Sequence, residues 1–385
     1  SQMMKAHLMR ASLCIDITPD SLDSELSALK AWMEEEKDTV YQAILNNLLG
    51  YYILDTGKKD ETAIDTAIAY FQRSLQDKEM LFRKSAVDYR PMTNSKELSE
   101  KYCGDNMYQL LARQAISRLS GYFIANPVSA EKIQNEILSI YDGLIDFYRQ
   151  QGMTDARLLL MLDKLHYKGN DVSRGGVNEK LRLTDEQVIT LLKQWAEEFA
   201  DSPLCGEVYC QLAERYDRMQ DYTAKLKAAQ TGLAKYPRSL SANDLKEQIA
   251  EVLTPRLMVE IPFAYPGKDV DLKVKYRNLA GLTVELYRMN LPVTSPVLER
   301  EINASTLSQY GKLVSSRHYD LSATPDYKET DTLLRYKFPV EGIYVVKSIP
   351  DGHRKYTAYG KAYVSSLQAI SLGLPDGKQE INIVD

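Results

Sequence analysis

The stretch AYPGKDVDLKVKYRNL, residues 264–279, decides the fold because its periodicity differs from that of the sequence before it. After a Pro-Gly pair, apolar and charged residues alternate at every second position. The apolar set is Val270, Leu272, Val274 and Tyr276, and the charged set is Asp271, Lys273, Lys275 and Arg277. Because successive side chains of a strand point to opposite faces, this pattern predicts a half-buried β-strand with Asp271, Lys273 and Lys275 outward.

Upstream of this stretch, apolar residues recur every three or four positions, which is typical of amphipathic helices. Capping signals precede several of these segments, and we expect helices to begin at them. The signals are Thr18–Ser21, Asp105-Asn106, Ser129 and Thr184-Asp185. Two polar stretches, residues 89–97 and 168–180, are expected to be loops, and Gly57 is expected to end a helix.

Residues 206–252 contain the most specific helical pattern. Two helices are predicted on either side of a short Met-Gln-Asp turn at residues 219–221, and the second is expected to stop at Tyr236-Pro237. Small residues are expected where the helices cross, at Ala213, Ala224 and Ala228. This resembles one tetratricopeptide-type unit of about 34 residues. We therefore predict a helical-hairpin, tetratricopeptide-like array over residues 1–253, and the number of units stays open.

Pro255 ends the helical region, because proline disfavours helix at the residue before it. Strands are predicted at Leu257–Ile261, Val270–Arg277 and Leu282–Met289, with later strands around turns at Glu341-Gly342 and Asp351-Gly352. Short strands at this spacing predict an antiparallel β-sandwich over residues 254–366. Residues 367–385 have their own Pro-Asp-Gly turn and a final strand, and we expect them to begin a following, truncated domain.

Composition limits the classes of function. The chain has 385 residues, 48 basic and 53 acidic side chains and a net charge of -5, so nucleic-acid binding is not expected. No window approaches 18 consecutive apolar residues, so no membrane insertion is expected. The N-terminal residues lack the apolar centre of a signal peptide, which leaves a cytoplasmic protein and one whose export signal has been removed as alternatives. Tyrosine is abundant, with 26 Tyr against 7 Phe.

Residues with chemical potential are scattered. Four cysteines (Cys14, Cys103, Cys205 and Cys210) have no metal-binding spacing and are expected to be buried or neutral thiols, and four histidines (His7, His166, His318 and His353) lie in separate contexts. The glycines of SRGGVN, residues 173–178, lack the lysine of a phosphate loop. The acidic run EEEKD, residues 34–38, is expected to be a solvated helix end. We predict no catalytic, cofactor-binding or metal-binding residue, no cofactor, and a protein that is not an enzyme.

The segment CGDNM, Cys103–Met107, resembles the Cys-Gly-Glu-Gln thioester sequence of complement and alpha-2-macroglobulin proteins. That chemistry needs a glutamine, and Asn106 is one methylene shorter. Asp105 and Asn106 also make a good helix cap for the segment that follows. The cap is the favoured interpretation.

A second resemblance covers roughly residues 256–385. It rests on VEIPFAYPGKDVDLKVKYRNLAGLTVELYRMN (259–290), YKFPVEGIYVVKSI (336–349) and VSSLQAISLGLPDGKQEINIVD (364–385). These segments are similar to the N-terminal macroglobulin-like domain of large alpha-2-macroglobulin family proteins from Bacteroides-type bacteria. The helical region is similar, with less specificity, to the leader that precedes this domain in those proteins.

The resemblance implies an exported protein, in the periplasm or at the outer-membrane surface, whose family traps proteases through a bait segment. This chain would then be a non-catalytic N-terminal structural and binding module, with further macroglobulin-like domains of the same chain and target proteases as its partners. The alternative is a cell-surface glycan- or peptide-binding protein with a helical-repeat binding surface and an accessory sandwich. Convergence of tyrosines in one exposed groove would favour the alternative, whereas burial at helix crossings would favour a packing role.

Overall fold

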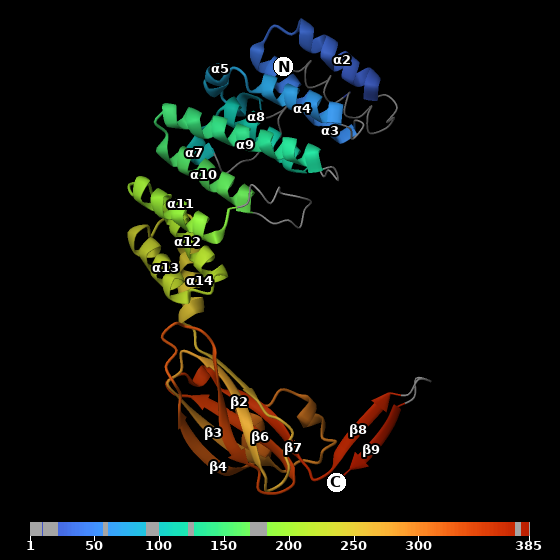
Figure 1. The fold of residues 1–385 in the computed structure, drawn as a ribbon, viewed down its shortest axis with the longest axis vertical. Helices are drawn as coiled ribbons and strands as arrows, with labels where there is room; N and C mark the ends of the chain where they lie inside the picture. The colour runs from blue at the N-terminus through green and yellow to red at the C-terminus, as the bar shows by residue number, and fades with distance from the viewer. Residues whose placement is uncertain are drawn as a thin grey trace. The chain divides into compact units, whose positions relative to one another are not determined.

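The computed structural model describes residue 10 and residues 22–56, 61–89, 100–121, 127–169, 183–373 and 379–384. Helices occupy the chain up to Leu253, and strands dominate from Arg256 onward (Figure 1). Contacts divide the chain into two compact units. One comprises Ser1–Arg215 with Gly232–Ala242, and the other comprises Tyr216–Thr231 with Asn243–Asp385. The fold therefore combines α-helices with a separate group of antiparallel sheets.

The first unit is built from helices that pack on their neighbours in the chain. Its helices are α2 (Leu22–Glu35), α3 (Thr39–Thr56), α4 (Glu61–Ser74), α5 (Lys78–Phe82), α7 (Glu100–Cys103), α8 (Met107–Gly121), α9 (Pro127–Gln150), α10 (Thr154–Gly169) and α11 (Asp185–Glu198). A short 3-10 turn, η2 (Val87–Tyr89), lies among them. Helices α12 (Cys205–Arg218) and α13 (Tyr222–Lys235) contribute residues to both units.

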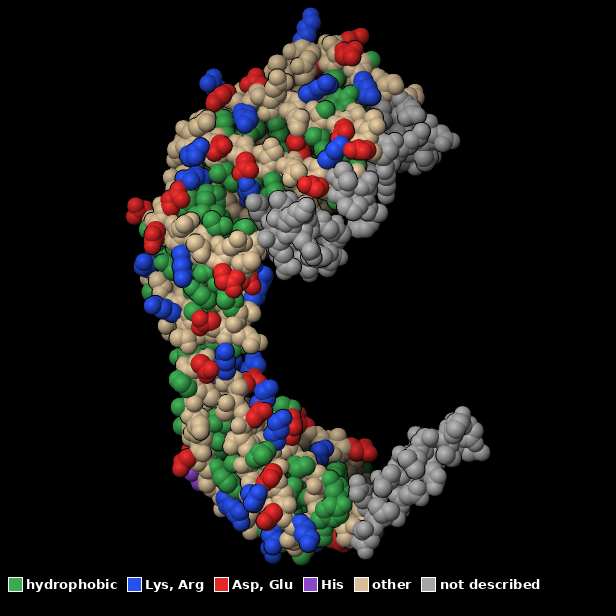
Figure 2. Space-filling view, in the orientation of Figure 1, with side chains coloured by type: hydrophobic (Ala, Val, Ile, Leu, Met, Phe, Trp, Pro, Cys, Tyr) green, Lys and Arg blue, Asp and Glu red, His purple; other side chains and the backbone are tan. Residues whose placement is uncertain are grey.

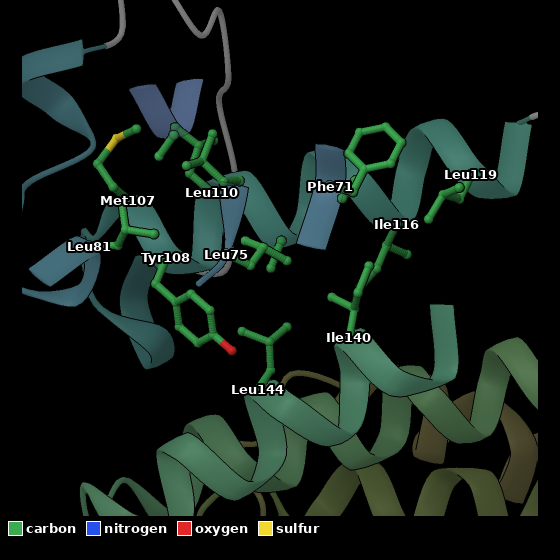
Figure 3. Packing of buried hydrophobic residues seen from close by; sticks show 14 of the residues in the cluster. Phe71, Leu75, Leu81, Met107, Tyr108, Leu110, Ile116, Leu119, Ile140 and Leu144 are labelled. Carbon is green, nitrogen blue, oxygen red and sulfur yellow. The ribbon is translucent and has the colours of Figure 1, made fainter. Parts of the chain in front are cut away.

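Apolar stripes of helices α2 to α10 form one core. Figure 3 shows Tyr108 and Ile116 of α8 facing Leu144 and Ile140 of α9, and Phe71 of α4 belongs to the same cluster. Tyr108 and Phe71 are almost completely buried. Burial raises the pKa of Tyr108 far above its usual range, because the phenolate would lose its hydration. The large aromatic rings thus act as packing groups between helices.

Several predicted helix boundaries are confirmed. Thr184 caps α11 in a capping box with Gln187, and Asn106 caps α8. The turn before α13 places Gln220 at a positive φ of 55°, and Asp221 accepts a hydrogen bond from the Ala224 amide at 2.9 Å. Helix α13 ends at Lys235, just before Tyr236-Pro237, as predicted.

Other boundaries differ from the prediction. Helix α9 begins at Pro127 rather than at Ser129, in keeping with the preference of proline for the first helical turn. Asp38, in the acidic run predicted to be a solvated helix end, also caps the next helix. Its Oδ1 accepts a hydrogen bond from the Val40 amide at 2.8 Å at the start of α3. The predicted signals at 18–21 and Gly57, and most of the predicted loops at 89–97 and 168–180, lie outside the described residues.

The second unit contains α14 (Ala242–Leu253) and the strands. These are β1 (Arg256–Glu260), β2 (Asp269–Arg277), β3 (Gly281–Met289), β4 (Gly311–Asp320), β5 (Thr330–Lys337), β6 (Gly342–Pro350), β7 (Ala358–Val364), β8 (Gln368–Gly373) and β9 (Gln379–Val384). They form antiparallel sheets with the orders β1-β2-β5 and β4-β3-β6-β7, and a β8-β9 hairpin. The three strands predicted around residue 270 are confirmed to within one residue at each end.

The inner faces of the three- and four-stranded sheets share one core. Leu272 and Val274 of β2 are fully buried in it together with Leu282 and Val284 of β3. The predicted alternation is confirmed, because Asp271, Lys273 and Lys275 are exposed. Strands β2 and β3 belong to different sheets, so the Asn278–Ala280 connection crosses between sheets instead of forming a hairpin.

The outer face of the four-stranded sheet carries a second, smaller core. The segment between β3 and β4 contains a 3-10 turn, η5 (Pro296–Glu299), and helix α15 (Ala304–Tyr310). Leu298 and Leu307 of this segment pack with Ile343 and Val345 of β6. Strand β6 is therefore buried on both faces, which explains why its residues are apolar at successive positions from Ile343 to Val346.

Gly206 in α12 marks a close approach to the turn that follows α13, within the first unit. A methyl group at this position would overlap Cβ and Oγ of Ser239 and come within 3.2 Å of the Tyr236 Cβ. We expect Gly206→Ala to lower the free energy of unfolding by about 1–3 kcal/mol, the cost of overpacking. Denaturant unfolding monitored by circular dichroism measures this change.

Gly143→Ala in α9 is the matched control. Its added methyl group would make only ordinary contacts at 3.4–3.5 Å, so helix propensity should raise the stability by about 0.5–1 kcal/mol. Equal changes in the free energy of unfolding for Gly206→Ala and Gly143→Ala would show that there is room for a methyl group at Gly206, and would contradict the prediction.

Candidate functional site

The end of α14 and the end of β2 meet in a polar junction within the second unit. The last carbonyls of a helix have no partners inside it. At α14, Nη2 of Arg277 donates to the Glu251 carbonyl at 2.6 Å and to the Thr254 carbonyl at 3.4 Å. Nδ2 of Asn278 donates to the Val252 carbonyl at 2.7 Å. Arg277, the last residue of β2, and Asn278, which follows it, thus donate to three carbonyls at the C-terminal end of α14.

Arg277 departs from the predicted alternation. It belongs to the charged set, but only 4% of its surface is exposed. Burial, together with the nearby Arg256, lowers the pKa of its guanidinium. Its Nε is buried without a hydrogen-bond partner among the described residues. The alternation in the sequence of β2 assigns each side chain to the inner or the outer face of the sheet. It cannot show that α14 covers the outer face at the end of the strand, where Arg277 lies.

A buried lysine lies beside this junction. The side chain of Lys225, on α13, is 3% exposed, and its Nζ donates to carboxylates of Asp217 and Glu251, both at 2.7 Å. Burial disfavours the charged ammonium, but the two hydrogen bonds outweigh this effect and raise the pKa of Lys225. The sequence does not single out Lys225, because its partners lie 8 and 26 residues away.

The Cys103–Met107 segment is a helix cap, as favoured from the sequence. Oδ1 of Asn106 accepts from the Gln109 amide at 2.8 Å. Its Nδ2 donates to the Cys103 carbonyl at 2.9 Å and to the Tyr148 hydroxyl at 3.1 Å. Cys103 is fully buried. Both ends of the Asn106 side chain are therefore engaged in holding the turn before α8.

The cysteines in the described parts of the chain are buried. Cys103, Cys205 and Cys210 are buried and are not joined in a disulfide bond, and burial raises the pKa of Cys205. This confirms the expectation for these three, while Cys14 and His7 lie outside the described residues. In the part of the chain that the structure describes, no group of three His, Cys, Asp or Glu side chains could hold a metal ion.

One histidine has a carboxylate partner that its sequence context does not reveal. Nε2 of His318, on β4, lies 2.8 Å from Oδ2 of Asp351, which follows β6. The Asp351 carboxylate occupies the space that a side chain at Gly281 would fill. The hydrogen bond to Asp351 raises the pKa of His318. The pair is exposed and has no nucleophile in its described contacts. Its effect is therefore on the pKa of His318 and on the local contact between β4 and the residue after β6.

The tyrosines of the helices pack against their neighbours. Every tyrosine of a helix in the described regions is buried or half-buried, among them Tyr70, Tyr108, Tyr141 and Tyr148. On the face drawn in Figure 2, acidic and basic side chains are interspersed over the helices. Within the described parts of the chain, no helix combines the length and apolarity needed to cross a membrane. The burial of the helical tyrosines favours a packing role for them over stacking against sugars.

Comparison of the chain with models of protein families and with curated proteins finds no match.

We expect Asn106→Ala to lower the free energy of unfolding by about 2 kcal/mol, since it removes a cap and leaves the buried Tyr148 hydroxyl with one partner fewer. Urea unfolding measures the difference. Asn303→Ala is the control, because Asn303 caps α15 from an exposed position, and its loss should cost about 1 kcal/mol or less. A loss at Asn106 no larger than at Asn303 would contradict the buried network.

We expect the pKa of His318, measured by proton NMR titration, to lie above the usual value of about 6.5 and to fall in Asp351→Asn. The folded-state pKa is raised, so the pair stabilises the fold fully below the unfolded pKa, and the contribution disappears as the pH rises through the folded pKa. Asp320→Asn should have the smaller effect, because Asp320 lies 3.9 Å away. An unchanged His318 titration in Asp351→Asn would exclude the pair.

Proposed function

We propose that residues 1–385 form a non-catalytic N-terminal structural and binding module of a bacterial alpha-2-macroglobulin-like protease-trapping protein. The observation that carries the proposal is the pair of antiparallel sheets that share one core directly after a helical region. In this proposal, residues 1–253 are a tetratricopeptide-like helical-hairpin array, and residues 254–366 are a macroglobulin-like β-sandwich.

The sheet core supports a framework role. Core residues come from both sheets, and the segment with α15 closes the outer face of β6, so that loops and edge strands are held on a well-packed body. Helical-hairpin arrays commonly offer extended surfaces to partner chains. The proposed partners are further macroglobulin-like domains of the same chain and target proteases, in the periplasm or at the outer-membrane surface. No catalytic residue or cofactor is assigned.

The alternative, a cell-surface glycan- or peptide-binding protein, would be favoured by aromatic rings on a shared exposed surface. The tyrosines of the described helices have instead become part of the packing. This observation supports the protein-binding module as the better proposal.

The test uses the complete reading frame that contains these residues, expressed with every domain it encodes. After incubation with trypsin, we expect cleavage at one accessible segment and co-elution of the protease with the cleaved protein in gel filtration. Residues 1–385 alone should neither retain trypsin nor hydrolyse a peptide substrate. A complete protein that is cleaved without retaining the protease would refute the proposal, as would hydrolysis by the 385-residue chain.

A further inference from the structure

A charged cleft of ≈ 420 Å³ lies within the second unit, beside the polar junction of α14 and β2. Its basic lining residues are Lys225, Arg256, Lys275, Arg277 and Lys328. The acidic lining residues are Glu251 and Glu329. Basic side chains remain in excess even when Asp217, which contacts Lys225, is included.

The ion pairs of the cleft leave this excess uncompensated. Lys225 uses Asp217 and Glu251, while Arg256 and Lys275 share Glu329 at 3.1 Å and 3.2 Å. Neither Arg277 nor Lys328 has a carboxylate within ion-pair distance in the described parts of the chain. Arg277 is bound instead to backbone carbonyls, which are neutral groups.

Two of the positive charges are placed directly against each other. Arg256 of β1 is the cross-strand partner of Arg277 of β2. Like charges in directly opposed positions destabilise a sheet, and the burial of Arg277 reduces the screening by water. The lowered pKa of Arg277 reflects the same two causes. An arrangement that is unfavourable by itself, in a cleft that solvent can enter, is typical of a binding site.

We propose that this cleft binds a small divalent oxyanion of the phosphate class. Such an anion would offset the repulsion between Arg256 and Arg277 and would supply the missing counter-charge to Lys328. Guanidinium groups suit this ligand, because their N–H donors match the spacing of phosphate oxygens. Glu329 is the internal competitor, since it occupies Arg256 and Lys275 while no anion is bound.

The test is a titration of the 385-residue chain with inorganic phosphate at constant ionic strength. Isothermal titration calorimetry measures the binding, and thermal unfolding measures the change in unfolding temperature. We expect saturable binding and a rise in the unfolding temperature. Arg256→Gln and Lys328→Gln should each weaken binding by about fivefold, the loss expected for one exposed charge contact. Lys227→Gln is the matched control, because Lys227 is an exposed lysine of α13 that does not line the cleft.

Glu329→Gln is the variant whose expected effect is stronger binding, which partial unfolding of the protein could not produce. Removing the competing carboxylate should strengthen phosphate binding by several-fold, because Arg256 and Lys275 become available. An equal rise in unfolding temperature with sodium chloride at matched ionic strength would overturn the proposal. So would unchanged binding in Arg256→Gln and Lys328→Gln, or weaker binding in Glu329→Gln.

Discussion

The open carbonyls at the end of α14 are the constraint on which the arrangement of the second unit depends. A helix that ends against other elements must find donors for these groups, or pay the cost of burying them unsatisfied. Arg277 and Asn278 supply the donors for Glu251, Val252 and Thr254. Asn278 can do so because its backbone has a φ of 56°, a conformation that asparagine tolerates better than most residues. The same residue turns the chain from one sheet into the other.

The crossing at Asn278 also determines how the strands share their core. Since β2 and β3 lie in different sheets, their apolar faces meet across the core instead of lying side by side. The period-two pattern of each strand then has one buried face and one polar face. Strand β6 is different, because residues of η5 and α15 cover its second face, and its sequence is apolar at successive positions. An alternating apolar pattern in a strand thus indicates that one face is covered, and successive apolar residues indicate that both faces are covered.

The sequence was sufficient for features that depend on local pattern. The alternation of β2, the cap at Asn106 and the turn at residues 219–221 each follow from residues within a short window. Strand β4 and helix α15 were missed, because β4 is an edge strand in which no residue is fully buried and α15 has only seven residues. The pairings of Arg277 with α14 and of His318 with Asp351 join residues 23 to 33 positions apart. No local period encodes such contacts.

The junction is made of hydrogen bonds and charges, although an apolar contact would often give equal or greater stability. A hydrogen bond from a guanidinium to a given carbonyl is satisfied in one narrow geometry, whereas apolar surfaces tolerate sliding. Arg277 and Asn278 therefore fix the angle and register at which α14 meets β2. The consequence is a surplus of positive charge, because backbone carbonyls accept hydrogen bonds without neutralising the arginine. The specificity of the junction and the charged character of the adjacent cleft have the same origin.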